Sequence, residues 1–333
     1  MRIATADLNF EWLDSWANLP DTASSRSGWC HPGAAITASG DFLTTHPGEP
    51  VVLTYGPDGR FRGSWSTDLV EVHALTLVRE DGVELLWLVD NGAKRDPELN
   101  YQYPGALANG QVIKTTLAGE QVAGLERPEL AGYRERRYSP TSVAVFEERH
   151  GGNGDLWVAD GYGANLVHRF TKHGEYVASI SGEEGAGSFA TPHGVWIDTR
   201  RAEPELLVAD RVNHRVQVYD LEGRFKRAFG ADYLSSPSAF APLGDLTVIA
   251  ELRARLTVVD ADDRLVGYLG ENEAVCAVDG WPNIKDEGGK VVRTSHLAPG
   301  KFNSPHGIAT DPAGNIYIAE WLIGGRVTKL ATV

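Results

Sequence analysis

Three histidines recur at the same place in a repeated stretch of the chain. His193 and His306 each stand in a Pro-His-Gly tripeptide and His73 stands in Val-His-Ala, and an apolar run that ends in an acidic residue follows each of them. Zinc is commonly held by imidazole nitrogens, and three histidines with a fourth position open to water or substrate form a catalytic zinc site. The three histidines therefore predict a metal centre, provided that the fold brings them together.

The same stretch occurs in three further copies that lack the histidine. Numbered along the chain, the six repeats carry histidine in the second, fourth and sixth copies, while Pro32, Thr141 and Ser238 take its place in the first, third and fifth. In a ring of six repeats, alternate copies are related by rotations of roughly 120°. If this position faces the axis of such a ring, the three imidazoles converge, and a metal held by them is expected.

A single histidine of this kind is more often a turn or packing residue than a ligand. The alternation favours a metal site, because a packing requirement shared by all six repeats would not select histidine in every second one. Seven histidines outside the pattern are interpreted as surface groups or as partners in local hydrogen bonds. They are His31, His46, His150, His168, His173, His214 and His296, of which His31 and His46 lie nearest the expected site.

The repeat length determines the expected architecture. The 333 residues give about 55 residues for each of six repeats, which is close to the length of a propeller blade. Each copy contains short apolar runs separated by glycine or aspartate turns, and helical periodicity is nowhere sustained. The sequence therefore predicts an all-β chain folded as one six-bladed β-propeller domain over residues 1–333.

The two ends of the chain are expected to pair. The segment from Leu8 to Trp12 is too apolar for a free tail, and the strand predicted from Arg326 to Leu330 needs a neighbour. Pairing these segments closes the ring and removes an exposed sheet edge. Two insertions, from Ala93 to Leu107 and from Asn272 to Lys301, interrupt the repeat and are expected either to cover the site or to decorate the surface.

Composition and charge exclude several classes of partner. The net charge of −14, from 31 basic and 45 acidic residues, argues against a nucleic acid or an anionic membrane as partner and leaves a small-molecule substrate. No long apolar segment or signal core is present, so a cytoplasmic location is expected. Cys30 and Cys276 form no CxxC motif and indicate neither a disulfide framework nor a thiolate metal site.

Acidic residues end the apolar runs of five repeats. Because a feature shared by five copies is usually structural, these side chains are expected to accept backbone N–H bonds in the following turn. If any of them takes part in chemistry, the longer glutamates are the better candidates. The five are Asp90, Asp160, Asp210, Glu251 and Glu320.

The repeats resemble NHL repeats and, more specifically, those of the peptidyl-α-hydroxyglycine α-amidating lyase family. The similarity runs from about Trp29 to Lys329 and is strongest from Ser139 to Asp220. The stretches that carry it are Ser139 to Val145, Val158 to Tyr162, Pro192 to Gly194, Val208 to Arg215 and Pro305 to Gly307.

This resemblance implies a six-bladed propeller whose catalytic zinc is held by His73, His193 and His306. It also implies that Tyr162, in an Asp-Gly-Tyr turn, is catalytic. It places a structural calcium at the carbonyl of Leu75 and at the residue after the last zinc histidine. That residue is Gly307, so the calcium lacks its charged side-chain ligand.

Two further departures from the family bear on the substrate and the location. No arginine stands between Thr45 and Glu49, where the family places a catalytic one, and Arg253 is the substitute proposed from its place two residues after Glu251. Secreted relatives carry a disulfide-forming cysteine at the position of Gly163, which agrees with a cytoplasmic protein.

Three functions remain open at this point. The first is a lyase that uses zinc, or another divalent transition metal, on a small hydroxylated or amide-type substrate, with Tyr162 relaying a proton. The second is a hydrolase of esters or lactones at the same metal. The third is a non-catalytic NHL-repeat binding platform in which the histidines are structural and no metal is bound.

Overall fold

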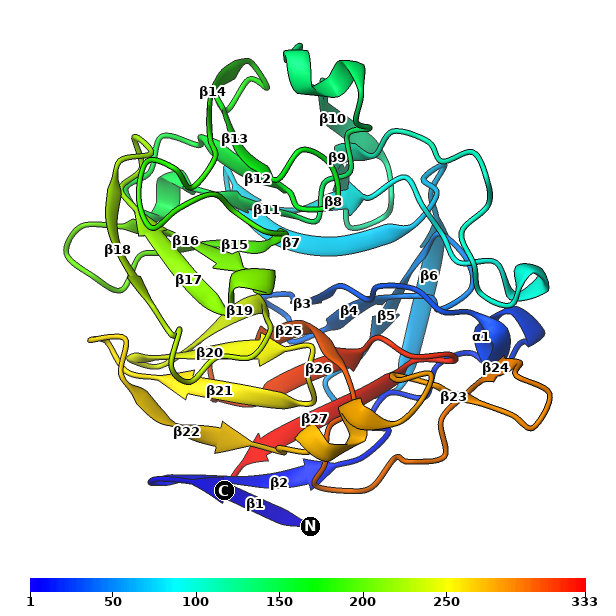
Figure 1. Ribbon diagram of the computed structural model, residues 1–333. Helices are drawn as coiled ribbons and strands as arrows, with labels where there is room; N and C mark the ends of the chain where they lie inside the picture. The colour runs from blue at the N-terminus through cyan, green and yellow to red at the C-terminus, as the bar shows by residue number, and fades with distance from the viewer. The chain divides into compact units, whose positions relative to one another are not determined.

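The computed structural model describes residues 1–333 and is built almost entirely of antiparallel strands. They form five four-stranded sheets, one five-stranded sheet and one two-stranded sheet (Figure 1). The chain divides into two compact units. The first unit comprises Met1–Val72, Lys94–Leu107 and Phe240–Val333, and the second comprises His73–Ala93 and Ala108–Ala239.

The second unit contains three four-stranded sheets, each of which runs back and forth between neighbours in sequence. Short turns with glycine at positive φ, such as that at Gly223, connect the outer strands. The strands are β7 (Val72–Glu80, in this unit from His73), β8 (Val83–Asp90), β9 (Gln111–Thr116), β10 (Gln121–Leu125), β11 (Ser142–Val145), β12 (Leu156–Asp160), β13 (Leu166–Phe170), β14 (Tyr176–Ile180), β15 (Pro192–Asp198), β16 (Glu205–Asp210), β17 (Arg215–Tyr219) and β18 (Phe225–Phe229).

The first unit contains the remaining sheets. The four-stranded ones are formed by β3 (Ala34–Ile36), β4 (Phe42–Thr45), β5 (Val51–Tyr55) and β6 (Phe61–Ser66), and by β19 (Pro237–Leu243, in this unit from Phe240), β20 (Leu246–Glu251), β21 (Arg255–Val259) and β22 (Leu265–Leu269). The others are formed by β1 (Arg2–Thr5), β2 (Leu8–Leu13), β25 (Pro305–Thr310), β26 (Ile316–Glu320) and β27 (Arg326–Thr332), and by β23 (Ile284–Lys285) and β24 (Val291–Val292).

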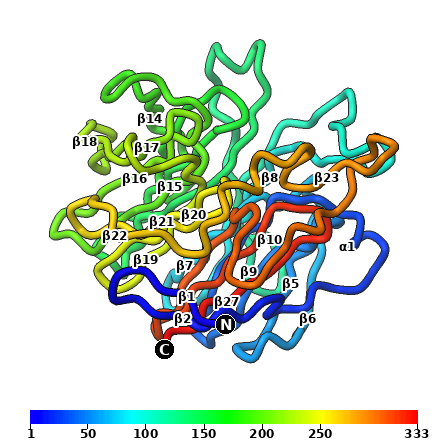
Figure 2. The backbone as a smooth tube through the Cα atoms, turned by 60° about the horizontal axis from the view of Figure 1, so that its bottom comes forward, coloured from blue at the N-terminus to red at the C-terminus, as the bar shows by residue number.

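The five-stranded sheet confirms the predicted pairing of the chain ends. Strand β2 lies antiparallel to β27, with Trp12 opposite Leu330 and Phe10 opposite Thr332. Figure 2 shows the N and C termini close together beside these strands. Trp12 is buried and packs on Phe302, with ring centroids 4.6 Å apart, so the pairing also contributes to the core.

Helices are short and peripheral. The single α-helix, α1 (Ala23–Ser27), is five residues long, and no helix of the structure has the length and apolarity needed to cross a bilayer. The 3₁₀ turns are η1 (Pro97–Leu99), η2 (Ala131–Arg134), η3 (Glu148–His150), η4 (Arg211–Asn213) and η5 (Glu273–Ala277). The expectation that helical structure is not sustained is confirmed.

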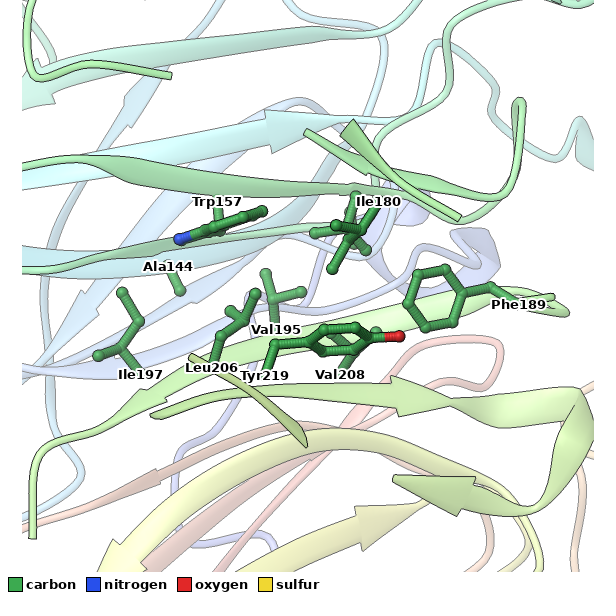
Figure 3. Packing of buried hydrophobic residues seen from close by; sticks show 11 residues of the cluster. Ala144, Trp157, Ile180, Phe189, Val195, Ile197, Leu206, Val208 and Tyr219 are labelled. Carbon is green, nitrogen blue, oxygen red and sulfur yellow. The ribbon is translucent and has the colours of Figure 1, made fainter. Parts of the chain in front are cut away.

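The core of the second unit lies between neighbouring sheets. Trp157 of β12 and Ile180 of β14 pack on a layer that includes Leu206 and Tyr219 of the next sheet (Figure 3). Strands β12 and β16 are buried along their whole length, because side chains on both of their faces are covered. This explains why their sequences are continuous apolar runs rather than alternating ones.

The acidic residues at the strand ends have structural partners, and the predicted bond to the following turn is made by Asp90 and Asp160. Asp160 accepts hydrogen bonds from the backbone N–H groups of Ser139 and Ala164, at 2.7 and 2.6 Å. Asp90, Asp210 and Glu320 likewise accept backbone N–H bonds, whereas Glu251 is bound by the side chains of Arg255 and Thr257. The bonds of Asp210 and Glu320 come instead from the segments that lead into β15 and β25, so these two carboxylates hold the start of a neighbouring strand.

The two insertions meet within the first unit. Asn100 donates from its amide to the carbonyl of Gly289, and its Oδ1 accepts from the N–H of Val291 at 2.8 Å. Around this contact Trp29, Tyr101 and Trp321 form an apolar cluster. The insertions are therefore joined to one another and are not independent surface decorations.

Candidate metal centre

His193 is held by the first residues of β15. The pairing of β15 with β16 shifts register between Pro192 and Val195, and a bulge of this kind redirects the side chains near it. The His193 side chain is 2% exposed, and its Nδ1 lies 2.8 Å from the main-chain oxygen of Ser238. The imidazole is therefore buried and oriented by a backbone acceptor.

His73 lies beside His193 in the second unit. It is completely buried on β7, and its Nδ1 lies 2.8 Å from the main-chain oxygen of Thr141. The ring centroids of His73 and His193 are 5.0 Å apart, with their planes inclined by 58°. The fold therefore brings two of the three predicted ligands together.

The backbone acceptors determine the tautomer of both rings. A carbonyl oxygen can only accept, so Nδ1 of each imidazole carries the proton and Nε2 carries the lone pair. Histidines that bind metals almost always donate their other N–H in this way, to a carbonyl or a carboxylate. The donor set of the second unit is thus suited to a divalent transition metal.

Tyr162 contacts both of these histidines. Its hydroxyl lies 3.1 Å from Nε2 of His193, and its ring centroid lies 5.4 Å from that of His73. The residue before it must be glycine, because a Cβ at Gly161 would lie 2.4 Å from the main-chain oxygen of Pro192. The predicted catalytic tyrosine is therefore adjacent to two of the predicted ligands.

Arg211 is a site residue that the sequence analysis missed. Its Nη2 lies 3.3 Å from the hydroxyl of Tyr162, its guanidinium lies 5.4 Å from the centre of that ring, and its buried Nη1 makes no hydrogen bond within the chain. A signal was present, because Arg211 directly follows the inner strand of the repeat that carries His193. The second unit thus places an arginine, a tyrosine and two imidazoles in one cluster.

His306, the third predicted ligand, lies in the first unit in the same local setting. The pairing of β25 with β26 shifts register between Pro305 and Gly307, and the buried His306 places its Nδ1 3.0 Å from the main-chain oxygen of Pro32. A Cβ at Gly307 would lie 2.5 Å from that same oxygen, so glycine is needed after the histidine. The tautomer is again the one that places the lone pair on Nε2.

His31 adds an imidazole beside His306. The two ring centroids are 5.2 Å apart, and the ring of His31 stacks on Trp321 at 5.1 Å. Its Nδ1 lies 2.6 Å from Oε1 of Glu71, a carboxylate that is itself buried. Burial alone would raise the pKa of Glu71, but the charge and hydrogen bonds of His31, together with the charge of Lys94, hold that pKa below its usual range.

Arg253, the other predicted catalytic residue, lies in the turn between β20 and β21 of the first unit. The buried Glu251 at the end of β20 is paired with Arg255, at 2.7 Å. Burial raises the pKa of the nearby Cys276 thiol to about 11, against the opposing charge of Arg253. A catalytic role for Arg253 stays a prediction.

Three histidines outside the pattern make the local hydrogen bonds expected of them. Nδ1 of His46 accepts from the N–H groups of Gly48 and Glu49, each at 3.0 Å, which is the opposite polarity to that of His193. The nitrogens of His168 contact the hydroxyls of Ser179 and Tyr133, and His214 contacts the carbonyl of Ser235.

Neither cysteine has the properties of a reactive thiol. Cys30 and Cys276 are both free, so no disulfide joins them. Burial raises the pKa of the Cys30 thiol to about 11, and a protonated thiol is a poor nucleophile.

Comparison with solved structures defines the class of the fold. The chain aligns over 97% of its length with a streptogramin B lyase (TM-score 0.58, 12% identity, 98% of that chain covered). It aligns as fully with virginiamycin B lyase from Staphylococcus aureus (TM-score 0.56, 13% identity, 100% of that chain covered). A protein of unknown function from Bacteroides thetaiotaomicron is similar over 99% of this chain and 79% of its own (TM-score 0.60, 15% identity). The fold is that of a six-bladed β-propeller.

Sequence relatives support NHL repeats as the building unit. NHL repeat-containing protein 3 of Homo sapiens is 26% identical over 241 residues, and that of Mus musculus over 238, in each case 69% of this chain. The matched region spans only 63% of the length of these relatives. A 44-residue segment, 13% of the chain, is 48% identical to part of the protein brain tumor of Drosophila melanogaster. No protein-family model matches the chain.

Proposed function

We propose that this NHL-repeat propeller is a metal-dependent lyase acting on a small hydroxylated or amide-type substrate. His73, His193 and His306 are the proposed metal ligands, and zinc or another divalent transition metal is the proposed ion. Tyr162 is the proposed catalytic residue, and Arg211 is added beside it. We take the type of reaction from the resemblance of the sequence to the amidating lyase family.

One observation carries this proposal. Each of the three repeat-related histidines donates from Nδ1 to the main-chain oxygen of the residue that replaces it in the next repeat, namely Thr141, Ser238 and Pro32. A packing role would not require the same tautomer three times. A ligand role does, because the lone pair must be on the nitrogen that faces the metal.

The six-bladed fold is the second support. Histidines in the second, fourth and sixth repeats occupy positions that a six-fold ring relates by roughly 120°. Within the second unit His73 and His193 contact one another, and within the first unit His306 has the same local setting.

A divalent metal at this centre would polarise a substrate oxygen and lower the pKa of a bound hydroxyl group. Tyr162 is positioned to relay the proton. Its Oη accepts the proton of the substrate hydroxyl while the phenol proton passes to the departing nitrogen. The carbon–nitrogen bond then breaks and the hydroxyl carbon becomes a carbonyl, so no oxidant is needed.

Arg211 holds Tyr162 in place for this transfer. Its hydrogen bond to the phenol oxygen and its position over the ring fix the rotamer of Tyr162 and stabilise negative charge on Oη during proton transfer. Hydrolysis of an ester or lactone would use the same residues with a water nucleophile. A cytoplasmic location stays a prediction from the sequence.

The NHL repeats of the relatives favour a second candidate, a non-catalytic binding platform. Metal analysis separates the two. Protein purified without added metal, and after reconstitution with zinc, is measured by inductively coupled plasma mass spectrometry alongside His193→Ala and His306→Ala. His46→Asn is the matched control, because His46 is also buried and an asparagine oxygen can still accept its two backbone bonds.

The proposal expects about one metal per chain in the wild type and in His46→Asn, with loss in the two alanine variants while circular dichroism stays unchanged. Screening with N-acylated hydroxyglycines then tests for amide and aldehyde products, and screening with esters and lactones tests for hydrolysis. A wild-type protein that binds no metal even after reconstitution would favour the platform.

A further inference from the structure

We propose that His31 is a further ligand of the metal centre, next to His306, and that Glu71 is the group that orients it. This inference rests on the proposed function, since it adds a ligand to the proposed centre. It concerns residues of the first unit and begins with the contact between His31 and Glu71.

The buried carboxylate determines the tautomer of His31. Oε1 of Glu71 lies 2.6 Å from Nδ1 of His31 and 3.3 Å from its main-chain nitrogen, so Glu71 binds the residue at two points. Because Glu71 accepts from Nδ1, Nε2 is the nitrogen of His31 that is left to bind a metal. A carboxylate that fixes a histidine in this way is a recurring partner of metal-binding histidines.

The pair formed by His31 and His306 resembles the pair formed by His73 and His193. The ring centroids are 5.2 Å apart in the first pair and 5.0 Å in the second, and the interplanar angles are 54° and 58°. All four rings donate from Nδ1 to an oxygen, three of them to carbonyls and His31 to a carboxylate. His31 therefore has the geometry of a ligand, although it stands outside the repeat position.

The surroundings of His31 hold its ring rigidly. Its plane is stacked on Trp321, inclined by 17°, and Trp321 in turn contacts Trp29 at 4.9 Å. Lys94 lies 3.7 Å from the other oxygen of Glu71, which balances the buried charge of the carboxylate. A ring fixed on its face and at Nδ1 has little freedom left, which is a requirement for a preorganised ligand.

His46 shows that burial in the first repeat does not by itself produce this arrangement. It is as buried as His31, at 5% exposure, but its Nδ1 accepts two backbone N–H bonds, so its proton is on Nε2. To bind a metal through Nε2, His46 would have to give up the proton on that nitrogen. The two histidines thus form a matched pair for testing.

A fourth imidazole changes which metal the centre favours. Four histidines saturate a tetrahedral zinc ion and leave no position for substrate. A metal that accepts five or six ligands, such as iron(II), cobalt(II) or nickel(II), keeps one or two positions open beside four imidazoles. The inference therefore favours a centre with more than four ligands.

The test uses cobalt(II) as the probe, because its visible absorption differs between four-coordinate and higher-coordinate sites. Wild type, His31→Ala, Glu71→Gln and His46→Asn are stripped of metal and titrated with cobalt(II) in competition with a chelator. His31→Gln is included so that loss of packing against Trp321 is separated from loss of the ligand. Circular dichroism and thermal melting check the fold of each variant.

We expect the weak absorption of a five- or six-coordinate ion in the wild type and in His46→Asn. His31→Ala and His31→Gln should each bind cobalt(II) at least 10-fold more weakly and with a changed spectrum, while Glu71→Gln should weaken binding by about 10- to 100-fold. Folded His31 variants with the wild-type spectrum and affinity would overturn the inference. If the His31 variants behave as wild type but His193→Ala abolishes cobalt(II) binding, the three-histidine centre stands without His31 as a ligand. If the wild type binds no metal, the three-histidine centre and the role of His31 both fail.

Discussion

Nδ1 of His193 donates to the main-chain oxygen of Ser238, 2.8 Å away, and Ser238 is the residue that takes the place of histidine in the following repeat. His73 with Thr141 and His306 with Pro32 repeat this relationship. The repeats that carry histidine therefore supply the hydrogen-bond donor, and the repeats between them supply the main-chain acceptor. Because the acceptor is a main-chain oxygen, the residue at the acceptor position can be proline, threonine or serine.

The contact between Tyr162 and His193 predicts the effect of removing the phenol oxygen. Tyr162→Phe should keep the bound metal and lose about 10²- to 10⁴-fold in kcat on the substrate found by screening, because proton relay is removed while the ligands remain. Steady-state kinetics with metal analysis of the same sample checks this. Unchanged turnover would remove Tyr162 from the mechanism.

The contact between Arg211 and Tyr162 predicts that the two side chains act together. Arg211→Gln should lower kcat, and in the Tyr162→Phe background the same substitution should cost much less, because residues in one hydrogen-bonded network are not additive. The four proteins of this double-mutant cycle are compared at equal metal content. Additive losses would mean that Arg211 acts independently of Tyr162.

His168 predicts a pH dependence of stability. Burial lowers its pKa to about 3, whereas an unfolded histidine titrates near 6.5, so the unfolded chain binds the extra proton between these values. Stability should therefore fall as pH decreases below about 6.5, by up to roughly 1.4 kcal/mol for each pH unit from this group.

Urea unfolding of the wild type and His168→Gln at pH 7 and pH 4.5 measures that contribution. Glutamine can still bond to Ser179 and Tyr133 but does not titrate, so the variant should lose less stability between the two pH values. Equal losses in both proteins would show that His168 does not set the dependence.

The terminal pairing predicts that the N-terminal strand stabilises the fold. Trp12→Ala removes a side chain that is 3% exposed and packed on Phe302, and it should lower the free energy of unfolding by about 3–5 kcal/mol. Glu11→Ala on the same strand is the control and should change it by less than about 0.5 kcal/mol, since Glu11 is exposed. Equal effects would indicate that β2 is not packed as described.

The fold was predictable from the sequence because its signals are local and repeated. Each repeat carries its own apolar runs, turns and strand-end carboxylate, and even the pairing of β2 with β27 followed from two segments that lacked neighbours. A structural function of the carboxylates was predictable because five repeats share them, but only Asp90 and Asp160 bond to the following turn as predicted. One domain over residues 1–333 stays a prediction.

Parts of the site could not be predicted, because they depend on contacts between distant segments. His31 and Glu71 are 40 residues apart, and in each case the other repeats carry different residue types at the matching place. Arg211 lies 49 residues after Tyr162, and Asn100 lies 191 residues before Val291. Such pairs leave no periodic signal in one sequence, and the choice of metal depends on how many of them act as ligands.

The five-stranded sheet, which pairs β2 with β27, also constrains when the protein can complete its fold. Strand β2 is synthesised long before β27, the strand with which it pairs. Until then, β2 has an unpaired edge and the buried face of Trp12 has no partner, a state that invites association with other chains. A chain whose synthesis ends before Arg326 would therefore be unable to complete its five-stranded sheet, whatever the state of the other repeats.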